Sequence, residues 1–260
     1  MKFSFIPDKN QIKEAILLSE KTGMNWEIND FVMPKIYDDS EAISNLVSLY
    51  RNCGRNLSGD TFHGAFLGID IAAIDPVMMT RSRELCRQSM EIASKIGVSG
   101  VVFHTGLIGG LRLDYYLRHW LEEAQAFFGE LCGEYPEITV FMENSFEQEP
   151  DVFTELMQRT KDIPNYRLCL DYGHGILTQT APDVWVRDFA PYLGHMHLND
   201  NDLRDDLHLI PGKGKIDFPK WLELIRQISY DGSVLLEVTG HEKAEASYEF
   251  MKRIVNEGVL

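Results

Sequence analysis

The segments VSGVVFHTG (residues 98–106) and ITVFMEN (residues 138–144) decide the fold, because each is a short apolar strand pattern that ends in a polar residue. His104 closes the first segment and Glu143 closes the second. The same arrangement recurs along the chain, where further strand patterns end at Glu27, His63, Asp171, His197 and Glu237. In a barrel of parallel strands, the residues at the carboxyl ends face one shared opening, where (β/α)8 enzymes keep their chemistry. The repetition therefore indicates a single functional site.

Strand and helix patterns alternate between these segments, which is typical of a parallel sheet with crossover helices. Strands are expected at residues 2–6, 25–28, 57–63, 100–104, 139–143, 167–171, 194–197 and 233–237. Helices are expected at residues 11–22, 81–96, 115–132, 219–228 and 242–255, with Gly97 and Gly133 ending two of them. No GxGxxG turn follows the first strand, which favours a closed barrel over an open doubly wound sheet. The predicted fold class is α/β, a single-domain (β/α)8 TIM barrel over residues 1–260.

The composition restricts the partners and the compartment. The net charge of −15 repels nucleic acid phosphates and anionic lipid, which argues against nucleic acid and membrane partners. No apolar run approaches the roughly 20 residues of a membrane helix. The chain starts with MKFSFIPDKNQ, which fits a first strand better than a secretory signal. Cys53, Cys86, Cys132 and Cys169 form no CxxC pair, so we expect reduced cysteines and a cytoplasmic protein. The oligomeric state stays open.

Four acidic or histidine residues come from consecutive predicted strands, namely Glu143, Asp171, His197 and Glu237. They should line one continuous half of the barrel mouth. Three carboxylates and one imidazole form an oxygen-rich site for a divalent cation, Mn²⁺, Co²⁺, Mg²⁺ or Zn²⁺. Unpaired, the carboxylates would repel one another, and a bound dication removes that cost. In the alternative interpretation, these residues act separately, as helix caps or in salt bridges.

Further polar residues are expected around the same mouth: His63, His104, His174, Asp206 and His208. As a group they could hold a second or third metal ion, or bind substrate hydroxyls. A single histidine is more often a hydrogen-bonded structural residue. We assign no role to His119, His195 or His241, and we expect strand geometry to turn His195 away from His197.

Two charged residues are candidates for substrate binding. Glu27 would orient a substrate hydroxyl or pair with a nearby base, and a structural salt bridge is an equal alternative. Lys213, in the PGKG turn, would either contact a substrate phosphate as a flexible point charge or remain an exposed turn lysine. The aromatic residues Trp26, Phe66 and Phe141 would form an apolar floor for a sugar, although aromatics at strand ends usually belong to the core.

Five motifs together resemble a known superfamily. They are HTG at His104, MEN at Glu143, LDYGH (170–174), HMHLND (195–200) and DLHLIPGKGKIDF (206–218). In order and spacing they resemble the xylose isomerase-like TIM barrels, and the resemblance covers essentially the whole chain. That superfamily joins sugar and sugar phosphate isomerases and epimerases with AP endonuclease family 2, the endonuclease IV enzymes. The resemblance points to the superfamily more firmly than to any one member.

The tagatose 3-epimerase-like branch implies a metal-dependent isomerase or epimerase of a sugar, sugar phosphate or related ketose. By this resemblance Glu143, Asp171, His197 and Glu237 bind one divalent metal. The metal holds two adjacent substrate oxygens and stabilises a cis-enediolate as a Lewis acid. The two glutamates then remove and return a proton at carbon, and His174 lies near the substrate hydroxyls. The partner would be a small carbohydrate.

The endonuclease IV branch implies a multi-zinc phosphoesterase acting on abasic DNA or another phosphodiester. Its nine zinc-binding positions correspond to His63, His104, Glu143, Asp171, His174, His197, Asp206, His208 and Glu237. Three Zn²⁺ ions would activate hydroxide and offset phosphodiester charge.

Several features weigh against the endonuclease. Tyr172 and Gly173 stand where those enzymes carry threonine and cysteine, and GAFLGID (64–70) replaces their aromatic DNA-probing segment. The acidic balance also disfavours a surface that follows phosphates. A non-catalytic sugar-binding barrel would be a third possibility, and it gives no reason for two opposed glutamates beside a metal. The preferred interpretation is the isomerase or epimerase with one metal.

Overall fold

The computed structural model describes residues 1–257 and shows a closed parallel barrel with strand order β1 to β8. The strands are β1 (Lys2–Phe5), β2 (Asn25–Ile28), β3 (Thr61–His63), β4 (Gly100–His104), β5 (Thr139–Glu143), β6 (Tyr166–Asp171), β7 (Leu193–Leu198) and β8 (Ser233–Leu236). Each strand pairs in parallel with the next, and β1 pairs with β8 to close the barrel. The (β/α)8 fold predicted from the sequence is confirmed.

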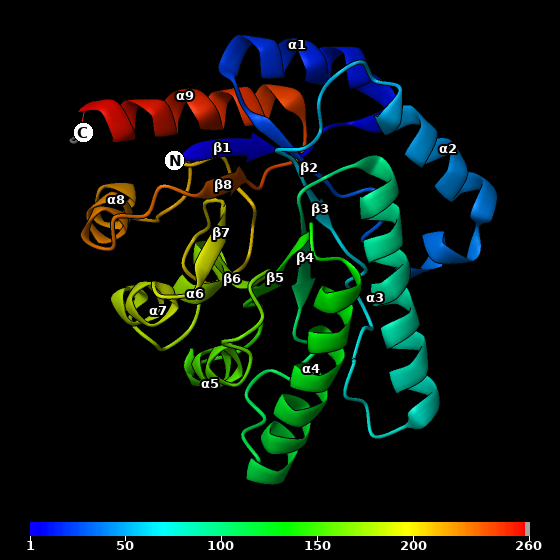
Figure 1. Ribbon diagram of the computed structural model, residues 1–260. Coiled ribbons are helices and arrows are strands. Elements are labelled where there is room, and N and C mark those ends of the chain that lie inside the picture. Colours follow the sequence, from blue (N-terminus) through cyan, green and yellow to red (C-terminus); the bar gives the residue numbers. More distant parts are fainter. Residues whose placement is uncertain (258–260) are drawn as a thin grey trace.

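Helices surround the barrel (Figure 1). They are α1 (Ile12–Thr22), α2 (Ser40–Arg51), α3 (Pro76–Ile96), α4 (Asp114–Glu134), α5 (Asp151–Arg159), α6 (Tyr172–Ile176), α7 (Pro182–Phe189), α8 (Phe218–Gln227) and α9 (His241–Glu257). Two short 3-10 helices, η1 (Lys9–Gln11) and η2 (Pro34–Asp38), precede α1 and α2. The last helix, α9, packs beside α1 across β1, which brings the two ends of the described chain to one side of the molecule (Figure 1). Among the described residues, no helix is both long and apolar enough to span a membrane.

Some element ends differ from the sequence predictions. The third strand starts at Thr61 instead of residue 57, because the chain turns first and the Asp60 N–H donates to the Leu57 carbonyl oxygen at 2.9 Å. Helix α3 starts at Pro76, five residues earlier than expected, because Asp75 caps its first turn. Helix α4 continues through Gly133, so the prediction of a cap there is wrong. Gly97 does end α3 with a left-handed φ of 94°, as predicted.

The core has two parts. Large aromatic side chains fill the space between the barrel and the helices, including Trp26, Trp120, Trp185 and Trp221. The barrel interior holds a separate small cluster of Val102, Phe141 and Cys169. Each of these three lies two positions before a strand-end residue of the predicted site: His104, Glu143 and Asp171. Because strand residues two positions apart share a face, the cluster forms a layer directly beneath the site.

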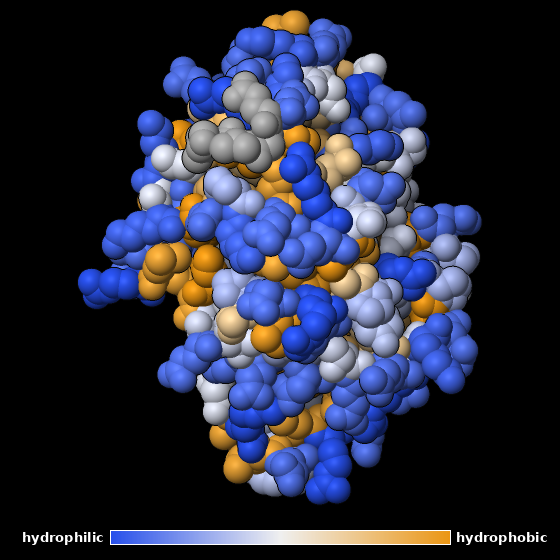
Figure 2. Space-filling model, turned by 90° about the vertical axis from the view of Figure 1, so that its left-hand side faces the viewer, coloured by the Kyte–Doolittle hydropathy of each residue, from blue (hydrophilic) through white to orange (hydrophobic). Residues whose placement is uncertain are grey.

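One face of the molecule is mainly hydrophilic. Figure 2 shows the face over α7 and α8, where charged and polar residues predominate and apolar residues form small separate patches. The cysteines are free, and three of them, Cys86, Cys132 and Cys169, are buried. This state agrees with the reduced cysteines expected from the sequence.

Candidate metal centre

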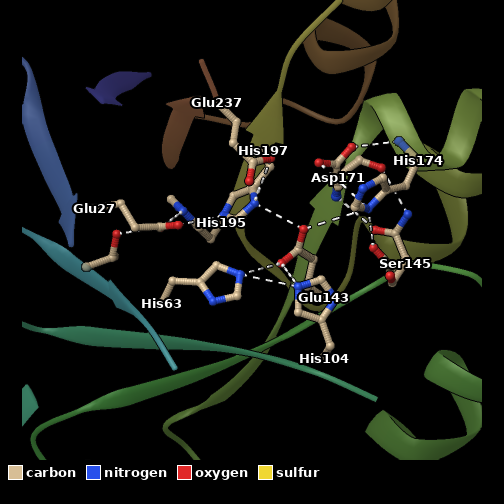
Figure 3. A network of polar contacts seen from close by, with 12 residues as sticks. Glu27, His63, His104, Glu143, Ser145, Asp171, His174, His195, His197 and Glu237 are labelled. Atoms are coloured by element: carbon tan, nitrogen blue, oxygen red, sulfur yellow. Dashed lines mark hydrogen bonds and ion pairs between the residues drawn. The ribbon is translucent and has the colours of Figure 1, made fainter. Parts of the chain in front are cut away.

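The carboxyl ends of the strands open into a cavity of about 740 Å³, a volume in the range of small-molecule sites. Seven of the site residues predicted from the sequence line it: His63, His104, Glu143, His174, Asp206, His208 and Glu237. Asp171 and His197 lie at its floor and are fully buried. Figure 3 shows Glu143 at the centre of this group, with His63, His104, His174 and His197 around it. The structure therefore brings the predicted strand-end and loop residues together.

The predicted metal ligands form one cluster. Glu143, Asp171, His197 and Glu237 each offer one atom, and these atoms all lie within 4.8 Å of one another. Each residue also has a buried polar atom without a hydrogen-bond partner, namely Glu143 Oε2, Asp171 Oδ2, His197 Nδ1 and Glu237 Oε2. Buried polar atoms are normally hydrogen bonded, so unpaired ones on four neighbouring residues need an explanation. A divalent cation fits these residues, because the cluster offers it carboxylate oxygens and an imidazole nitrogen that lack hydrogen-bond partners.

The electrostatics of the cluster depend on close acid and histidine pairs. His197 Nδ1 lies 3.0 Å from Glu143 Oε1 and 3.4 Å from Glu237 Oε2. Although burial acts to raise it, His197 lowers the pKa of Glu237 to about 2. Burial raises the pKa of Asp171 to about 7, and the carboxylates of Glu237 and Glu143 add to that effect. Since a metal ligand must be deprotonated, metal binding here would release protons.

Two further groups adjoin this cluster. On one side His104 Nε2 lies 3.0 Å from Glu143 Oε2 and 3.3 Å from His63 Nε2. On the other side Asp206 Oδ2 lies 3.3 Å from His174 Nε2 and 2.9 Å from His208 Nε2. Although burial acts to lower it, the bond to Asp206 raises the pKa of His208 to about 9. Each group has the donor atoms of a potential metal site of its own.

Asn144 fixes the position of Asp171 from the neighbouring strand. Its side chain donates to the Asp171 carbonyl oxygen at 2.9 Å and accepts from the Asp171 N–H at 2.8 Å. The Asp171 carboxylate then accepts from the His174 N–H at 2.7 Å, as the N-cap of α6. His174 Nδ1 lies 2.9 Å from the Asn144 carbonyl oxygen, which directs Nε2 toward Asp206. We did not predict this role of Asn144 from the sequence, although the residue belongs to the MEN motif.

Asp200 organises the loop that carries Asp206 and His208. Its buried carboxylate accepts hydrogen bonds from four backbone N–H groups, those of Asn201, Gly212, Gly214 and Ile216. An antiparallel bridge between Asp200 and Leu209 holds the loop back over the barrel mouth. We did not predict this role either, and the signal for it is an aspartate two residues after the end of β7, followed by the glycine-rich PGKGK turn.

Position 214 requires glycine, because the loop passes so close to Asp200 that a larger side chain would not fit. A Cβ atom there would lie 2.3 Å from the Asn201 carbonyl oxygen and 2.4 Å from Asp200 Oδ1. We therefore expect Gly214→Ala to destabilise the protein by about 1–3 kcal/mol, as overpacking does. Gly133→Ala is the matched control, because Gly133 is helical and has nothing within 4 Å. It should stabilise the protein by about 0.5–1 kcal/mol. Urea unfolding of both variants measures the difference, and equal stabilities would contradict the role of Gly214.

Glu27 and His195 lie side by side below the cavity lining. Glu27 is fully buried and does not line the cavity, so in this structure it contacts His195 and His197 instead of a substrate hydroxyl. This contact corresponds to the other interpretation, in which Glu27 pairs with a nearby base. His195 does not turn away from His197, because residues two positions apart on a strand share a face. Their ring centroids are 5.1 Å apart.

Lys213 is exposed and does not line the cavity. Its backbone N–H donates to the Ile210 carbonyl oxygen at 2.9 Å, which closes the PGKG turn outside the site. Its position corresponds to the alternative of an exposed turn lysine, away from the cavity lining. Of the three aromatic candidates, Phe66 lines the cavity and stacks near His104, with ring centroids 4.1 Å apart. Trp26 and Phe141 belong to the core.

Comparison with known proteins relates most of the chain to one family. The family described as "Xylose isomerase-like TIM barrel" matches residues 30–254. An uncharacterized protein of Methanocaldococcus jannaschii, MJ1311, is 29% identical over 210 residues, which make up 76% of this chain and 71% of that protein.

Solved structures show the same architecture. A crystal structure of a D-tagatose 3-epimerase-like protein is 25% identical, with a TM-score of 0.76 over 100% of both chains. The TTHB071 protein from Thermus thermophilus, in a crystal soaked with zinc chloride, is 21% identical, with a TM-score of 0.79 over 100% of both chains. A structure of L-ribulose 3-epimerase is 14% identical, with a TM-score of 0.75 over 99% of this chain and 96% of that one. The last two show the fold alone. With the family matched over most of its length, this chain belongs to the xylose isomerase-like TIM barrels.

Proposed function

We propose that this protein is a divalent-metal-dependent epimerase or isomerase of an unphosphorylated ketose or a related sugar ketone. The observation that supports this most strongly is the set of unpaired buried atoms on Glu143, Asp171, His197 and Glu237. These four residues would hold the metal ion, Mn²⁺, Co²⁺, Mg²⁺ or Zn²⁺. The similarity to a D-tagatose 3-epimerase-like protein supports the same class of reaction.

When bound, the metal supplies Lewis-acid stabilisation of negative charge on adjacent substrate oxygens. Glu143 and Glu237 would each remove or return a proton at the carbon beside the carbonyl group. Both line the cavity and can reach a bound substrate. Asp171 and His197 would bind the metal from the floor, where substrate has no access. His174 lies at the cavity wall and would contact substrate hydroxyls.

The cavity lining favours a neutral carbohydrate. Uncharged polar side chains on its wall, those of Ser145, Gln148 and Thr178, can exchange hydrogen bonds with sugar hydroxyls. Phe66 offers an apolar face to sugar C–H groups. The lining contains no lysine or arginine within the described part of the chain, and phosphate sites usually have at least one. These features support an unphosphorylated substrate over a sugar phosphate.

A multi-zinc phosphoesterase is the second candidate. The observation that favours it is the pair of extra donor groups beside the central cluster, one with His63 and His104, the other with His174, Asp206 and His208. Imidazole-rich sets of this kind suit Zn²⁺. Among the described residues, the lining has no basic side chain of lysine or arginine, which weighs against a polyanionic substrate such as DNA.

Metal content per chain separates the two candidates. The protein is purified without chelator or added metal, and its bound metals are counted by elemental analysis. About one ion per chain, together with turnover of free ketoses, would support the epimerase or isomerase. Two or three tightly held zinc ions, with hydrolysis of a small phosphodiester and no turnover of ketoses, would overturn it.

A further inference from the structure

A buried polar network lies beneath the candidate metal centre, formed by Glu27, Thr61, His195 and Ser233 under His197 (Figure 3 labels Glu27, His195 and His197). We propose that Glu27 is a positioning residue that orients His197 for metal binding, and that Thr61 and His195 hold Glu27 in place. The proposal rests on the proposed function only in that His197 is taken as a metal ligand.

The contacts of Glu27 divide between its two carboxylate oxygens. Oε1 lies 3.1 Å from His197 Nε2. Oε2 accepts from Thr61 Oγ1 at 2.7 Å and lies 3.0 Å from His195 Nε2. His195 Nδ1 in turn lies 2.6 Å from Ser233 Oγ. Strands β2, β3, β7 and β8 all contribute to this network, so the closed barrel itself fixes the carboxylate.

One arrangement of protons is compatible with the contacts of this network when a metal is bound. His197 faces Glu143 and Glu237 with Nδ1, so Nδ1 must keep its lone pair for the metal and Nε2 must carry the hydrogen. The Nε2–H then lies 3.1 Å from Glu27 Oε1, close enough for an ion pair, although the two atoms do not meet at hydrogen-bond angles in this structure. The Ser233 hydroxyl donates to His195 Nδ1, and His195 Nε2–H donates to Glu27 Oε2. A carboxylate that accepts the second N–H of a metal-bound histidine fixes its tautomer and ring orientation.

Burial shows why a packing role alone does not explain these residues. Glu27, His195 and His197 are each 0% exposed. Burying a carboxylate is costly even when it is paired, and apolar residues of similar size usually give equal or greater stability. The barrel uses apolar residues at neighbouring interior positions, where Val102 and Phe141 pack. Glu27 and His195 are polar where other interior positions are apolar, and they lie directly under His197, the histidine of the central cluster.

The test is a comparison of Co²⁺ affinities in chelator-treated full-length protein. Glu27→Gln keeps the size of the side chain and removes its charge, so it should weaken Co²⁺ binding about 10–100-fold and change the visible absorption of bound Co²⁺. Glu147→Gln is the matched control. Glu147 is also a buried glutamate at the mouth, but it contacts Thr105 and the Ser145 N–H and not the central cluster. Its replacement should leave Co²⁺ affinity within about twofold of wild type, because outer-shell effects require contact with a ligand.

Stability is measured alongside, by thermal unfolding of each metal-free variant, and affinities are compared at a temperature where all are folded. Equal Co²⁺ affinity and spectrum in wild type and Glu27→Gln would overturn the proposal. If Glu27→Gln does not fold, Thr61→Val removes one of the bonds that hold Glu27 and should still weaken binding. Unchanged affinity in that variant would equally reject the role. A wild-type protein that binds no divalent metal would instead reject the proposed function.

Discussion

Replacing Glu237 by glutamine should lower kcat for sugar epimerisation or isomerisation by about 10²–10⁴-fold, the usual contribution of a general acid or base. Glutamine keeps the shape and one oxygen donor but cannot accept or return the proton at carbon. KM should change much less than kcat, because the loss lies in a step after substrate binding. Glu143→Gln should behave in the same way, since both glutamates line the cavity beside the same cluster. Steady-state kinetics at saturating metal measures the effect.

Glu149→Gln is the control for this experiment. Glu149 is exposed on the same face of the barrel and pairs with Arg112 at 3.4 Å, away from the central cluster. Its kcat should match that of the wild type. Metal content is determined for each variant, so that loss of metal is separated from loss of the proton-transfer group. Undiminished turnover in both Glu143→Gln and Glu237→Gln would rule out the two-glutamate mechanism.

Asp171→Asn should stabilise the metal-free protein above neutral pH while it abolishes tight metal binding. Burial raises the pKa of Asp171 from 3.8 to about 7 in the folded protein. A pKa raised on folding contributes stability that is complete below pH 3.8 and is lost as the pH rises through about 7. At pH 8 the metal-free wild type should therefore be less stable than the variant by an amount on the order of a few kcal/mol. Asparagine can still accept the His174 N–H and cap α6.

Urea unfolding of chelator-treated wild type and Asp171→Asn at pH 5 and pH 8 measures this difference. The stability advantage of the variant should be larger at pH 8 than at pH 5. Adding a divalent metal should stabilise the wild type by mass action and leave the variant unchanged. An advantage that does not grow with pH would contradict the burial of an ionisable Asp171 as the cause.

The strand-end residues could be predicted because they depend on local pattern. His104 and Glu143 each close an apolar strand, and the parallel register pairs them directly, as β4 and β5 align. Asp171 and His197 pair in the same way between β6 and β7. Once the barrel closes, these four residues, paired across neighbouring strands, lie at or just below its mouth. The pattern of apolar strands that end in polar residues was therefore enough to predict the central cluster.

The height of a residue along the barrel axis could not be predicted from the sequence. It depends on the register between neighbouring strands. Glu27 pairs with Thr61, two residues before His63, so its side chain lies one layer below the strand ends. His195 pairs with Ser233 in the same lower layer. The sequence shows that Glu27 lies near the end of a strand but gives no offset between neighbouring strands. Because of this offset, Glu27 is a buried partner of His197 and does not reach the cavity where substrate would bind.

The conformation of the loop after β7 could not be predicted from the sequence either. The length of the segment after β7 indicates a functional loop, yet the direction of each side chain depends on the four N–H groups gathered by Asp200. That folding turns Asp206 and His208 into the cavity and leaves Lys213 outside it. The same loop conformation places all three residues, and residue type alone does not show which of them face the cavity.

Proton exchange at carbon tests the proposed reaction most directly. The protein is freed of metal, divided, and incubated in D₂O with a panel of free ketopentoses and ketohexoses, with and without added Mn²⁺, Co²⁺, Mg²⁺ or Zn²⁺. We expect NMR to show deuterium at the carbon beside the carbonyl group of at least one ketose, only in the metal-loaded samples, and not with Glu237→Gln. No deuterium in any ketose from a metal-loaded protein that hydrolyses phosphodiesters would contradict the epimerase or isomerase and favour the multi-zinc phosphoesterase.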